Sequence, residues 1–324
     1  MNENKTNINW YPGHMFKTKK ELQNDISLTD LVIELLDARI PLSSRNPDIY
    51  LMTENKKRII ILNKKDLADS ETNKKWKEYF SVEAPTLLLN SEENKEVKSV
   101  LNFIDQIMSE KVKKDQEKGI KFPIIRLMIV GVPNVGKSSF INRLANRKTM
   151  EVGDKPGVTK RKQWIRIDNN KELLDTPGIL WPRFDSKETG LHLALVGSIK
   201  DGLVDEMDMS LKLLEHLILN YPDNLAKRYN IEEEVKSFIE DLNKNKNNES
   251  KFATISFNIF KNLSAIKLDK NKLYKLLLVI GYKKNVYRQN QEIDEERVCK
   301  MLIDDFRKGR LGRISLERPE GENV

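Results

Sequence analysis

The chain has 324 residues, of which 39% are hydrophobic and 33% are charged, a composition typical of soluble globular proteins and not of disordered chains. This length suits about two domains, because a single core rarely grows beyond about 250 residues. Cys299 is the one cysteine, which excludes an internal disulfide and a cysteine-based zinc site. The net charge of +8 favours a polyanionic partner, although a lysine-rich surface also serves solubility.

Signals for membranes and secretion are missing from the sequence. No apolar run approaches the ~20 residues that a transmembrane helix needs, and the first residues lack the apolar core of a signal peptide. We therefore expect no stable membrane association and a cytoplasmic location.

The first part of the chain alternates short apolar runs with helical patterns. Residues 31–37, the run from Arg58 and the run from Pro85 are rich in strand formers, and residues 43–54, 70–80 and 94–108 read as helices between them. This alternation predicts an α/β fold with a doubly wound, mostly parallel sheet. A charged connector, residues 111–119, continues or ends the last of these helices.

Another strand pattern, residues 124–131, runs into a glycine-rich loop and a helix, and residues 163–167 and 172–175 read as a hairpin. The α/β domain is therefore expected to cover residues 1–185. From residue 186 the apolar spacing becomes helical, which predicts an α-helical domain over residues 186–318. Residues 319–324 read as a disordered tail, and His192 and His216 read as ordinary surface or core residues of the helices.

The glycine-rich loop matches the phosphate-binding pattern G-x-x-x-x-G-K-[ST] from Gly131 to Ser138, between a strand and a helix. Backbone N–H groups of such a loop cradle phosphates, Lys137 reaches the β- and γ-phosphates, and Ser138 supplies an oxygen to Mg²⁺. The expected nucleotide-binding residues of this loop and the start of its helix are Asn134, Val135, Gly136, Lys137, Ser138 and Ser139.

Two further segments complete the expected magnesium and γ-phosphate site. Asp175 ends a strand and can hold Mg²⁺ through water, and Gly178 in the same Asp-Thr-Pro-Gly segment can donate its N–H to the γ-phosphate. Thr159 offers a second hydroxyl ligand for Mg²⁺, with an ordinary surface threonine as the alternative.

The segment Asn63-Lys64-Lys65-Asp66 follows a strand and predicts guanine specificity. Asp66 can accept hydrogen bonds from N1–H and the 2-amino group of guanine, which adenine does not offer, while Lys64 covers the base and Asn63 braces the phosphate loop. This segment precedes the phosphate loop, so the nucleotide motifs occur in circularly permuted order. The segment that senses the γ-phosphate then runs directly into the helical domain, which predicts that nucleotide state shifts residues 179–200.

These residues resemble those of the circularly permuted GTPases, and within them the bacterial ribosome biogenesis GTPase A family. The resemblance lies in the segments Trp10 to Met15, Asp37-Ala-Arg-Ile-Pro41, Gly131 to Ser139 and Leu174 to Pro182, and it weakens after about residue 220. It implies GTP hydrolysis to GDP coupled to late assembly of the large (50S) ribosomal subunit. It also implies that Asn90 and Ser91 form a further base-contacting loop.

Three residues bear on the control of hydrolysis. Ile179 stands where many related GTPases carry a water-orienting glutamine, which predicts slow intrinsic hydrolysis stimulated by the ribosomal subunit. His14 is the replacement that the resemblance supports, with a structural histidine capping a helix as the alternative. Asn134 is the expected ligand of a potassium ion beside the phosphates, as in similar potassium-stimulated GTPases, with a hydrogen bond bracing the loop as the alternative.

The expected partners are the large-subunit precursor, its rRNA and ribosomal proteins, bound by a monomer. The segment from Phe306 to Arg318 carries five basic residues against one acidic residue, which suits RNA phosphates, although a solvated basic tail has the same composition. A metabolic P-loop kinase would need no guanine-reading segment. A regulatory GTPase with a tRNA or membrane-associated partner remains the alternative.

Overall fold

The computed structural model describes residues 23–145, 163–175, 186–246 and 268–319. The chain divides into two compact units, one formed by Met1–Lys200 with Glu317–Pro319 and the other by Asp201–Leu316 with Glu320–Val324. The first unit thus continues past residue 185, the end expected from the sequence. It also includes residues 317–319, which follow the second unit in the chain.

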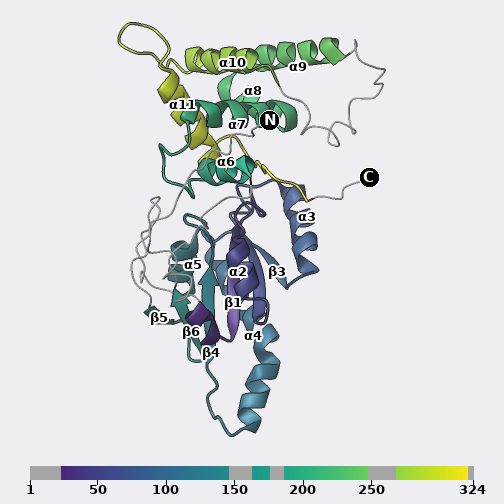
Figure 1. Ribbon diagram of the computed structural model, residues 1–324, viewed down its shortest axis with the longest axis vertical. Helices are drawn as coiled ribbons and strands as arrows, with labels where there is room; N and C mark the ends of the chain where they lie inside the picture. Colours follow the sequence, from purple (N-terminus) through teal and green to yellow (C-terminus); the bar gives the residue numbers. More distant parts are fainter. Residues whose placement is uncertain (1–22, 146–162, 176–185, 247–267, 320–324) are drawn as a thin grey trace, which may run out of the picture. The chain divides into compact units, whose positions relative to one another are not determined.

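The first unit is built on a six-stranded sheet with the order β3-β2-β1-β4-β6-β5 (Figure 1). All neighbouring strands are parallel except β5 and β6, which form the expected antiparallel hairpin. The sequence therefore correctly predicted the mostly parallel, doubly wound α/β architecture. The strands are β1 (Leu31–Asp37), β2 (Lys57–Asn63), β3 (Thr86–Leu89), β4 (Ile125–Val130), β5 (Gln163–Arg166) and β6 (Lys171–Asp175).

The described helices of the first unit are α2 (Pro47–Met52), α3 (Ser70–Ser81), α4 (Asn94–Glu117), α5 (Lys137–Leu144) and α6 (Lys187–Leu195). Helix α2 is shorter than the expected 43–54. It starts at Pro47 because Asn46 caps it, with the side chain accepting from the Asp48 N–H, and because proline fits the first turn of a helix and not its interior. Residues 38–44 form turns instead.

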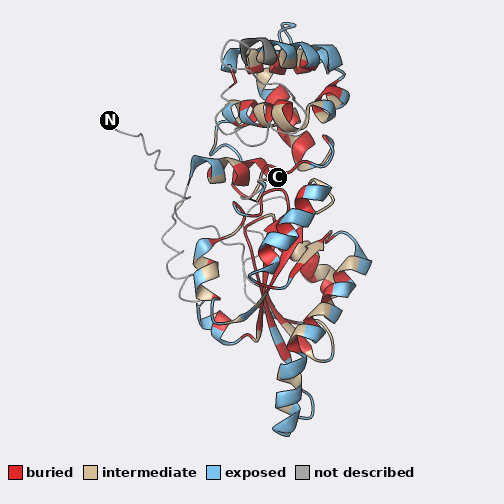
Figure 2. Cartoon of the chain, turned by 90° about the vertical axis from the view of Figure 1, so that its right-hand side faces the viewer, coloured by how far each residue is buried: buried red, intermediate tan, exposed pale blue. Residues whose placement is uncertain are grey.

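The core of the first unit lies on both faces of the sheet. Every residue of β1 is buried, as expected for a central parallel strand. On one face Trp76 and Phe80 of α3 pack with Leu36, and Ile49 of α2 packs with Val32. Helix α4 packs against α5, and Figure 2 shows the strands as a buried layer between helices with exposed outer sides.

The second unit is helical in its described part, as the sequence predicted. It contains α7 (Glu206–Asn220), α8 (Pro222–Tyr229), α9 (Glu232–Lys246), α10 (Lys270–Lys283) and α11 (Glu295–Arg307). Helix α7 contacts α8, α10 and α11. Asp305 of α11 is fully buried and accepts from Arg228 Nε at 2.8 Å and from the Tyr229 hydroxyl at 3.0 Å, which ties α8 to α11.

No helix in the described ranges has both the length and the apolar character needed to cross a bilayer.

Candidate functional site: a nucleotide-binding edge of the sheet

The ends of the parallel strands bring the expected motifs to one edge of the sheet. Strands β1, β2, β3, β4 and β6 run in the same direction, so the segments that follow them meet at the carboxyl edge, where open α/β sheets bind ligands. The end of β6 lies beside the end of β4, with Asp175 paired to Ile129. We call this the nucleotide edge.

The phosphate loop begins after β4 and passes close to its neighbours. A side chain at Gly131 would place Cβ 2.5 Å from the Leu35 carbonyl oxygen, and one at Gly136 would place it 2.4 Å from Asn63 Nδ2. Gly136 has φ +102° and is the N-cap of α5. Glycine is therefore required at both positions. The N–H groups of the loop lie at the N-terminus of α5, which is the positive end of the helix dipole.

Asn63 joins the guanine-reading segment to the phosphate loop. Its Nδ2 donates to the Val135 carbonyl oxygen at 2.8 Å and to Ser91 Oγ at 3.1 Å, and its Oδ1 accepts from the Ser91 N–H at 3.0 Å. Asn63, Ser91 and Val135 are all buried. This is the bracing contact that the sequence predicted for Asn63, and it also brings Ser91 to the site.

Lys64 forms a second link between the same two segments. Its backbone has φ +59°, and its Nζ donates to the Asn134 carbonyl oxygen at 2.6 Å. The same Nζ lies 3.2 Å from Oδ2 of Asp37, a fully buried carboxylate at the end of β1. The loops after β1, β2 and β4 are thus bonded to one another.

Asp66 has a buried acceptor that the described protein does not satisfy. Its Oδ1 is shielded from solvent and has no hydrogen-bond partner among the described residues. A buried polar atom left in this state costs about 1–3 kcal/mol. A guanine base supplies N–H donors for a carboxylate at this position, so the residues present fit a guanine nucleotide.

Lys137 lies at the start of α5 with its side chain buried in the phosphate loop. Its Nζ donates to the carbonyl oxygens of Gly131 at 3.2 Å and Val132 at 3.1 Å. Ser138 and Ser139 follow in the first turn and are half-buried. The loop thus places a cation and two hydroxyl side chains at a helix N-terminus, which suits phosphate groups and a hard cation such as Mg²⁺.

The phosphate loop is also bonded to the turn that follows α6. Asn134, at φ +57°, donates from Nδ2 to the Gly197 carbonyl oxygen at 2.6 Å, and Ser198 Oγ donates to the Pro133 carbonyl oxygen at 2.8 Å. The amide nitrogen of Asn134 therefore braces the loop, and its Oδ1 is the atom that a potassium ion would use. These bonds keep residues 197–198 in the first unit.

Asp37 and Arg39, which the sequence points to only through a family resemblance, form a buried ion pair. Arg39 donates from Nε to Asp37 Oδ1 at 2.9 Å and from Nη2 to Oδ2 at 2.7 Å. Burial raises the pKa of the Asp37 carboxyl, but Arg39 and Lys64 outweigh burial and hold this pKa well below its usual range. The short D-x-R spacing was the available signal. The pair supplies a fixed negative charge beneath Lys64.

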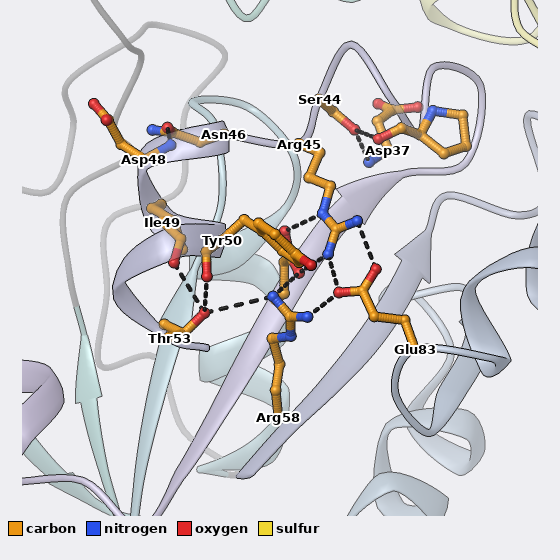
Figure 3. Close-up of polar contacts among 12 residues, drawn as sticks. Asp37, Ser44, Arg45, Asn46, Asp48, Ile49, Tyr50, Thr53, Arg58 and Glu83 are labelled. Atoms are coloured by element: carbon orange, nitrogen blue, oxygen red, sulfur yellow. Dashed lines mark hydrogen bonds and ion pairs between the residues drawn. The ribbon is translucent and has the colours of Figure 1, made fainter. Parts of the chain in front are cut away.

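The loop after β1 is held from below by a network of ion pairs (Figure 3). Arg45 and Arg58 both pair with Glu34 and Glu83, and both guanidinium groups lie over the Tyr50 ring, at 4.4 and 4.8 Å from its centroid. On the same loop, Ser44 Oγ accepts from the Asp37 N–H at 3.0 Å. This network fixes the backbone that carries Asp37.

Glu317 joins the first unit after the chain has passed through the second. Its carboxylate accepts from the backbone N–H groups of Leu42 at 2.7 Å and Ser43 at 3.0 Å, and it lies 3.1 Å from His192 Nδ1. The Glu317 carbonyl oxygen accepts from Trp76 Nε1 at 3.2 Å. His192 is a buried residue, as the sequence allowed, but its Nδ1 also lies 3.2 Å from Ser43 Oγ and so links α6 to this junction.

Several expected residues lie outside what the structure describes. His14, Thr159, Gly178 and Ile179 fall in undescribed ranges, and Asp175 is described as the end of β6 without its side chain. Asn90 is described: its Oδ1 accepts from the Glu92 N–H, and its own N–H donates to Glu96. No group of three or more His, Cys, Asp or Glu side chains that could hold a metal occurs in the described ranges.

The basic segment near the C-terminus is partly neutralised by neighbouring acids. Its first part ends α11, and Arg307 pairs with Asp201, Lys308 with Asp304, and Arg310 with Asp304 and Asp305. Half-exposed pairs of this kind remain available to solvent, but they lower the local positive charge. The first residues of the segment belong to α11, which ends at Arg307, rather than to a strand or tail. That the segment binds RNA phosphates stays a prediction.

Comparisons with known proteins agree with this geometry. Residues 126–257 match the family model described as 50S ribosome-binding GTPase. The ribosome biogenesis GTPase A of Bacillus licheniformis is 39% identical over 97% of this chain and 99% of its own length, and that of Bacillus pumilus is 36% identical over the same shares. The solved structure of GNP-bound YlqF from T. maritima covers 94% of this chain and 99% of its own, with 24% identity and a TM-score of 0.58.

Proposed function

The chain belongs to the ribosome biogenesis GTPase A family of circularly permuted GTPases, and we propose that it acts as a nucleotide-dependent switch in late assembly of the large ribosomal subunit. It hydrolyses GTP to GDP and phosphate, as the family match indicates. The proposed partners are the large-subunit precursor, its rRNA and its ribosomal proteins. The protein would bind them as a monomer in the cytoplasm.

The observation that carries the proposal is the joining of the base-reading and phosphate loops. Asn63 bonds to Val135, Lys64 bonds to Asn134, and Asp66 presents a buried acceptor without a partner in the described chain. A base bound at Asp66 and phosphates bound at Lys137 would be held by one bonded framework. Such preorganisation lowers the cost of ordering the site when the nucleotide binds.

The phosphate and metal roles are assigned residue by residue. Lys137 would contact the β- and γ-phosphates, and Ser138, Thr159 and Asp175 would hold Mg²⁺, directly or through water. Mg²⁺ would neutralise charge that develops on the phosphate oxygens. Gly178 would donate its N–H to the γ-phosphate, while Asn90 and Ser91 would complete the base site.

Hydrolysis would be slow without a partner. Ile179 offers no group that orients water, and His14 is the proposed replacement, supplied when the partner binds. Asn134 Oδ1 is the proposed potassium ligand. Equal hydrolysis rates in potassium and in sodium would remove the potassium role.

Control of the second unit is proposed to pass through residues 197–198. This turn is bonded to Asn134 and Pro133 of the phosphate loop and is followed directly by the second unit. A ligand that reorders the phosphate loop would change these bonds, which is how a local event at a nucleotide reaches a distant element.

The test is GTP turnover measured with purified large ribosomal subunits, with small subunits, with tRNA and with lipid vesicles. We expect the large subunit to stimulate turnover and the other three to have no effect. Co-sedimentation with large subunits in GDP and in a non-hydrolysable GTP analogue should show tighter binding in the analogue. Stimulation by tRNA or lipid alone would replace the ribosomal role with that of a regulatory GTPase.

A further inference from the structure

The turn between α4 and β4 exposes apolar side chains far from the nucleotide edge. Phe122 is 85% exposed, Ile120 is 47% exposed and Ile124 is 43% exposed. The turn precedes β4, so it lies at the opposite edge of the parallel sheet from the phosphate loop, and Figure 1 shows α4 extending beyond the sheet to reach it. With its 24 residues, α4 spans about 36 Å at 1.5 Å per residue.

The same segment of the chain carries four exposed lysines. Lys113, Lys114, Lys118 and Lys121 are all exposed, and none of them forms an ion pair with the residues that the structure describes. Lys111 differs, because it pairs with Asp30 at 3.1 Å and with Asp115 at 3.0 Å. We call residues 113–124 the connector tip. Its acids are Asp115, which Lys111 already neutralises, and Glu117, so positive charge prevails.

Hydrogen bonds brace the turn of the connector tip. The Gly119 and Ile120 N–H groups donate back to the carbonyl oxygens of Gln116 and Asp115, and Lys111 Nζ donates to the Ile124 carbonyl oxygen at 2.9 Å. Gly119 has φ +87°, and a Cβ there would meet nothing within 4 Å. The backbone on both sides of Lys121 and Phe122 is therefore hydrogen-bonded, and the space beside Gly119 is open.

We propose that the connector tip binds rRNA, with its lysines on backbone phosphates and the Phe122 ring stacked on an unpaired base. The proposal rests on the ribosomal role proposed above and adds the surface that meets RNA. Unpaired lysines bind polyanions with release of counterions. Single-stranded RNA loops are recognised by stacking on aromatic side chains. A protein partner fits less well, since lysine is depleted from protein–protein interfaces.

The experiment compares two tip variants, Phe122→Ser and Lys118→Glu/Lys121→Glu, with two matched controls. Val82→Ser removes another exposed apolar side chain, 92% exposed after α3, and Lys75→Glu/Lys77→Glu makes the same charge change on the outer side of α3. Binding is measured by co-sedimentation with large subunits in a non-hydrolysable GTP analogue and by filter binding to protein-free large-subunit rRNA. GTP affinity is measured for every variant.

We expect Phe122→Ser to weaken binding to both ligands by about five- to 150-fold, the range for losing one stacked base. The lysine variant should weaken binding and make the slope of log affinity against log salt shallower by about 1.4 to 1.8. GTP affinity should stay unchanged, because the tip and the nucleotide edge lie at opposite ends of α4. The two controls should bind as the unmodified protein does.

Three outcomes would overturn the proposal. If the tip variants bind like the unmodified protein, the connector tip is not a binding site. If the control variants weaken binding as much as the tip variants do, the effect is not specific to the tip. If the tip variants lose binding to subunits but still bind protein-free rRNA, the tip contacts a ribosomal protein and not rRNA. If the unmodified protein itself ignores large subunits, the ribosomal role fails, and the protein-free rRNA still decides whether the tip binds RNA.

Discussion

The two edges of the sheet in the first unit differ in how their charged side chains are bonded and exposed. At the nucleotide edge Arg39, Lys64 and Lys137 are each bonded to a carboxylate or to loop carbonyl oxygens. At the connector tip the lysines are exposed and Phe122 projects into solvent. Bonded, buried groups pre-shape a site for a small ligand, whereas exposed cations and an aromatic ring suit a large polyanion. One unit can therefore carry two separable binding functions.

The largest contrast is expected between Arg39→Met at the nucleotide edge and Arg126→Met at the opposite edge. Arg39→Met leaves the buried Asp37 carboxylate without its main partner, which costs about 3–5 kcal/mol for a buried pair broken on one side. Arg126 is half-exposed at the start of β4, so its loss should change stability by no more than about 0.5 kcal/mol. Urea unfolding measures both, and equal losses would contradict the contrast.

Acid should weaken the nucleotide edge through Asp37. Its pKa is lower in the folded protein than the value of about 3.9 in an unfolded chain. Its contribution to stability is therefore complete above that value and is lost as the pH falls below it towards the folded pKa. Chemical unfolding between pH 5 and pH 3 should show a steeper loss for the unmodified protein than for Asp37→Asn. Parallel curves would mean that the pair contributes nothing to acid sensitivity.

Asp66→Asn should change which nucleotide binds and leave RNA binding by the connector tip unchanged. Losing a hydrogen bond to a charged group costs about 1.5–3 kcal/mol, or roughly 12- to 150-fold in GTP affinity. The affinity for xanthosine triphosphate should rise, because its 2-oxo group accepts a hydrogen bond from the new amide. Calorimetric titration measures both nucleotides.

Asp69→Asn is the matched control for that substitution. Asp69 caps α3 three positions further along the chain, and asparagine caps helices equally well. It should leave nucleotide preference as it was. An unchanged preference in the Asp66 variant would mean that Asp66 does not read the base.

Asn63→Ala should loosen the framework that joins the two nucleotide loops. It removes the bonds to Val135 and Ser91 and strands their buried partners, at a cost of about 1–3 kcal/mol in unfolding free energy. GTP affinity should fall with it, as titration would show. The control is Asn170→Ala, in the β5–β6 turn at the opposite edge; comparable loss of GTP affinity there would argue against a special role for the brace.

The smallest effect is expected for Ser198→Ala, which removes one bond between the phosphate loop and the turn after α6. A single hydrogen bond contributes about 0.5–1.5 kcal/mol, so GTP affinity should fall by roughly two- to 12-fold. Ser210→Ala alters another buried serine, within the second unit. Equal nucleotide binding by both variants would show that the turn does not sense the phosphate loop.

Local pattern was enough to predict the motifs and the sheet. The apolar runs predicted the strands, the glycine spacing predicted the phosphate loop, and the brace by Asn63 followed from its position at the end of β2. Helix ends did not follow from apolar spacing, because the start of α2 depends on the Asn46 cap and Pro47. The roles of His14 and Thr159 stay predictions.

Contacts between distant residues were not predictable. The bonds from Glu317 to residues 42 and 43 join positions more than 270 apart in the chain, and no local pattern encodes such pairs. The pair of Arg307 with Asp201 was missed for the same reason, since these residues are far apart in sequence. The pairs of Lys308 and Arg310 with Asp304 and Asp305 are local, and they follow from the extension of α11 to Arg307. The sequence predicted residues 111–119 only as a charged connector that continues or ends a helix, although the apolar residues Ile120, Phe122 and Ile124 beside Lys118 and Lys121 were visible.

Glu317 has a consequence for how the protein is made. Synthesis runs from the N-terminus, and domains generally fold as they emerge. Here the last contacts of the first unit, to Leu42, Ser43 and Trp76, wait until all of residues 201–316 have been translated. The helical unit is in effect an insertion within the GTPase unit. A nascent chain that stops before residue 317 therefore leaves the GTPase unit unfinished, even though every nucleotide motif has already been synthesised.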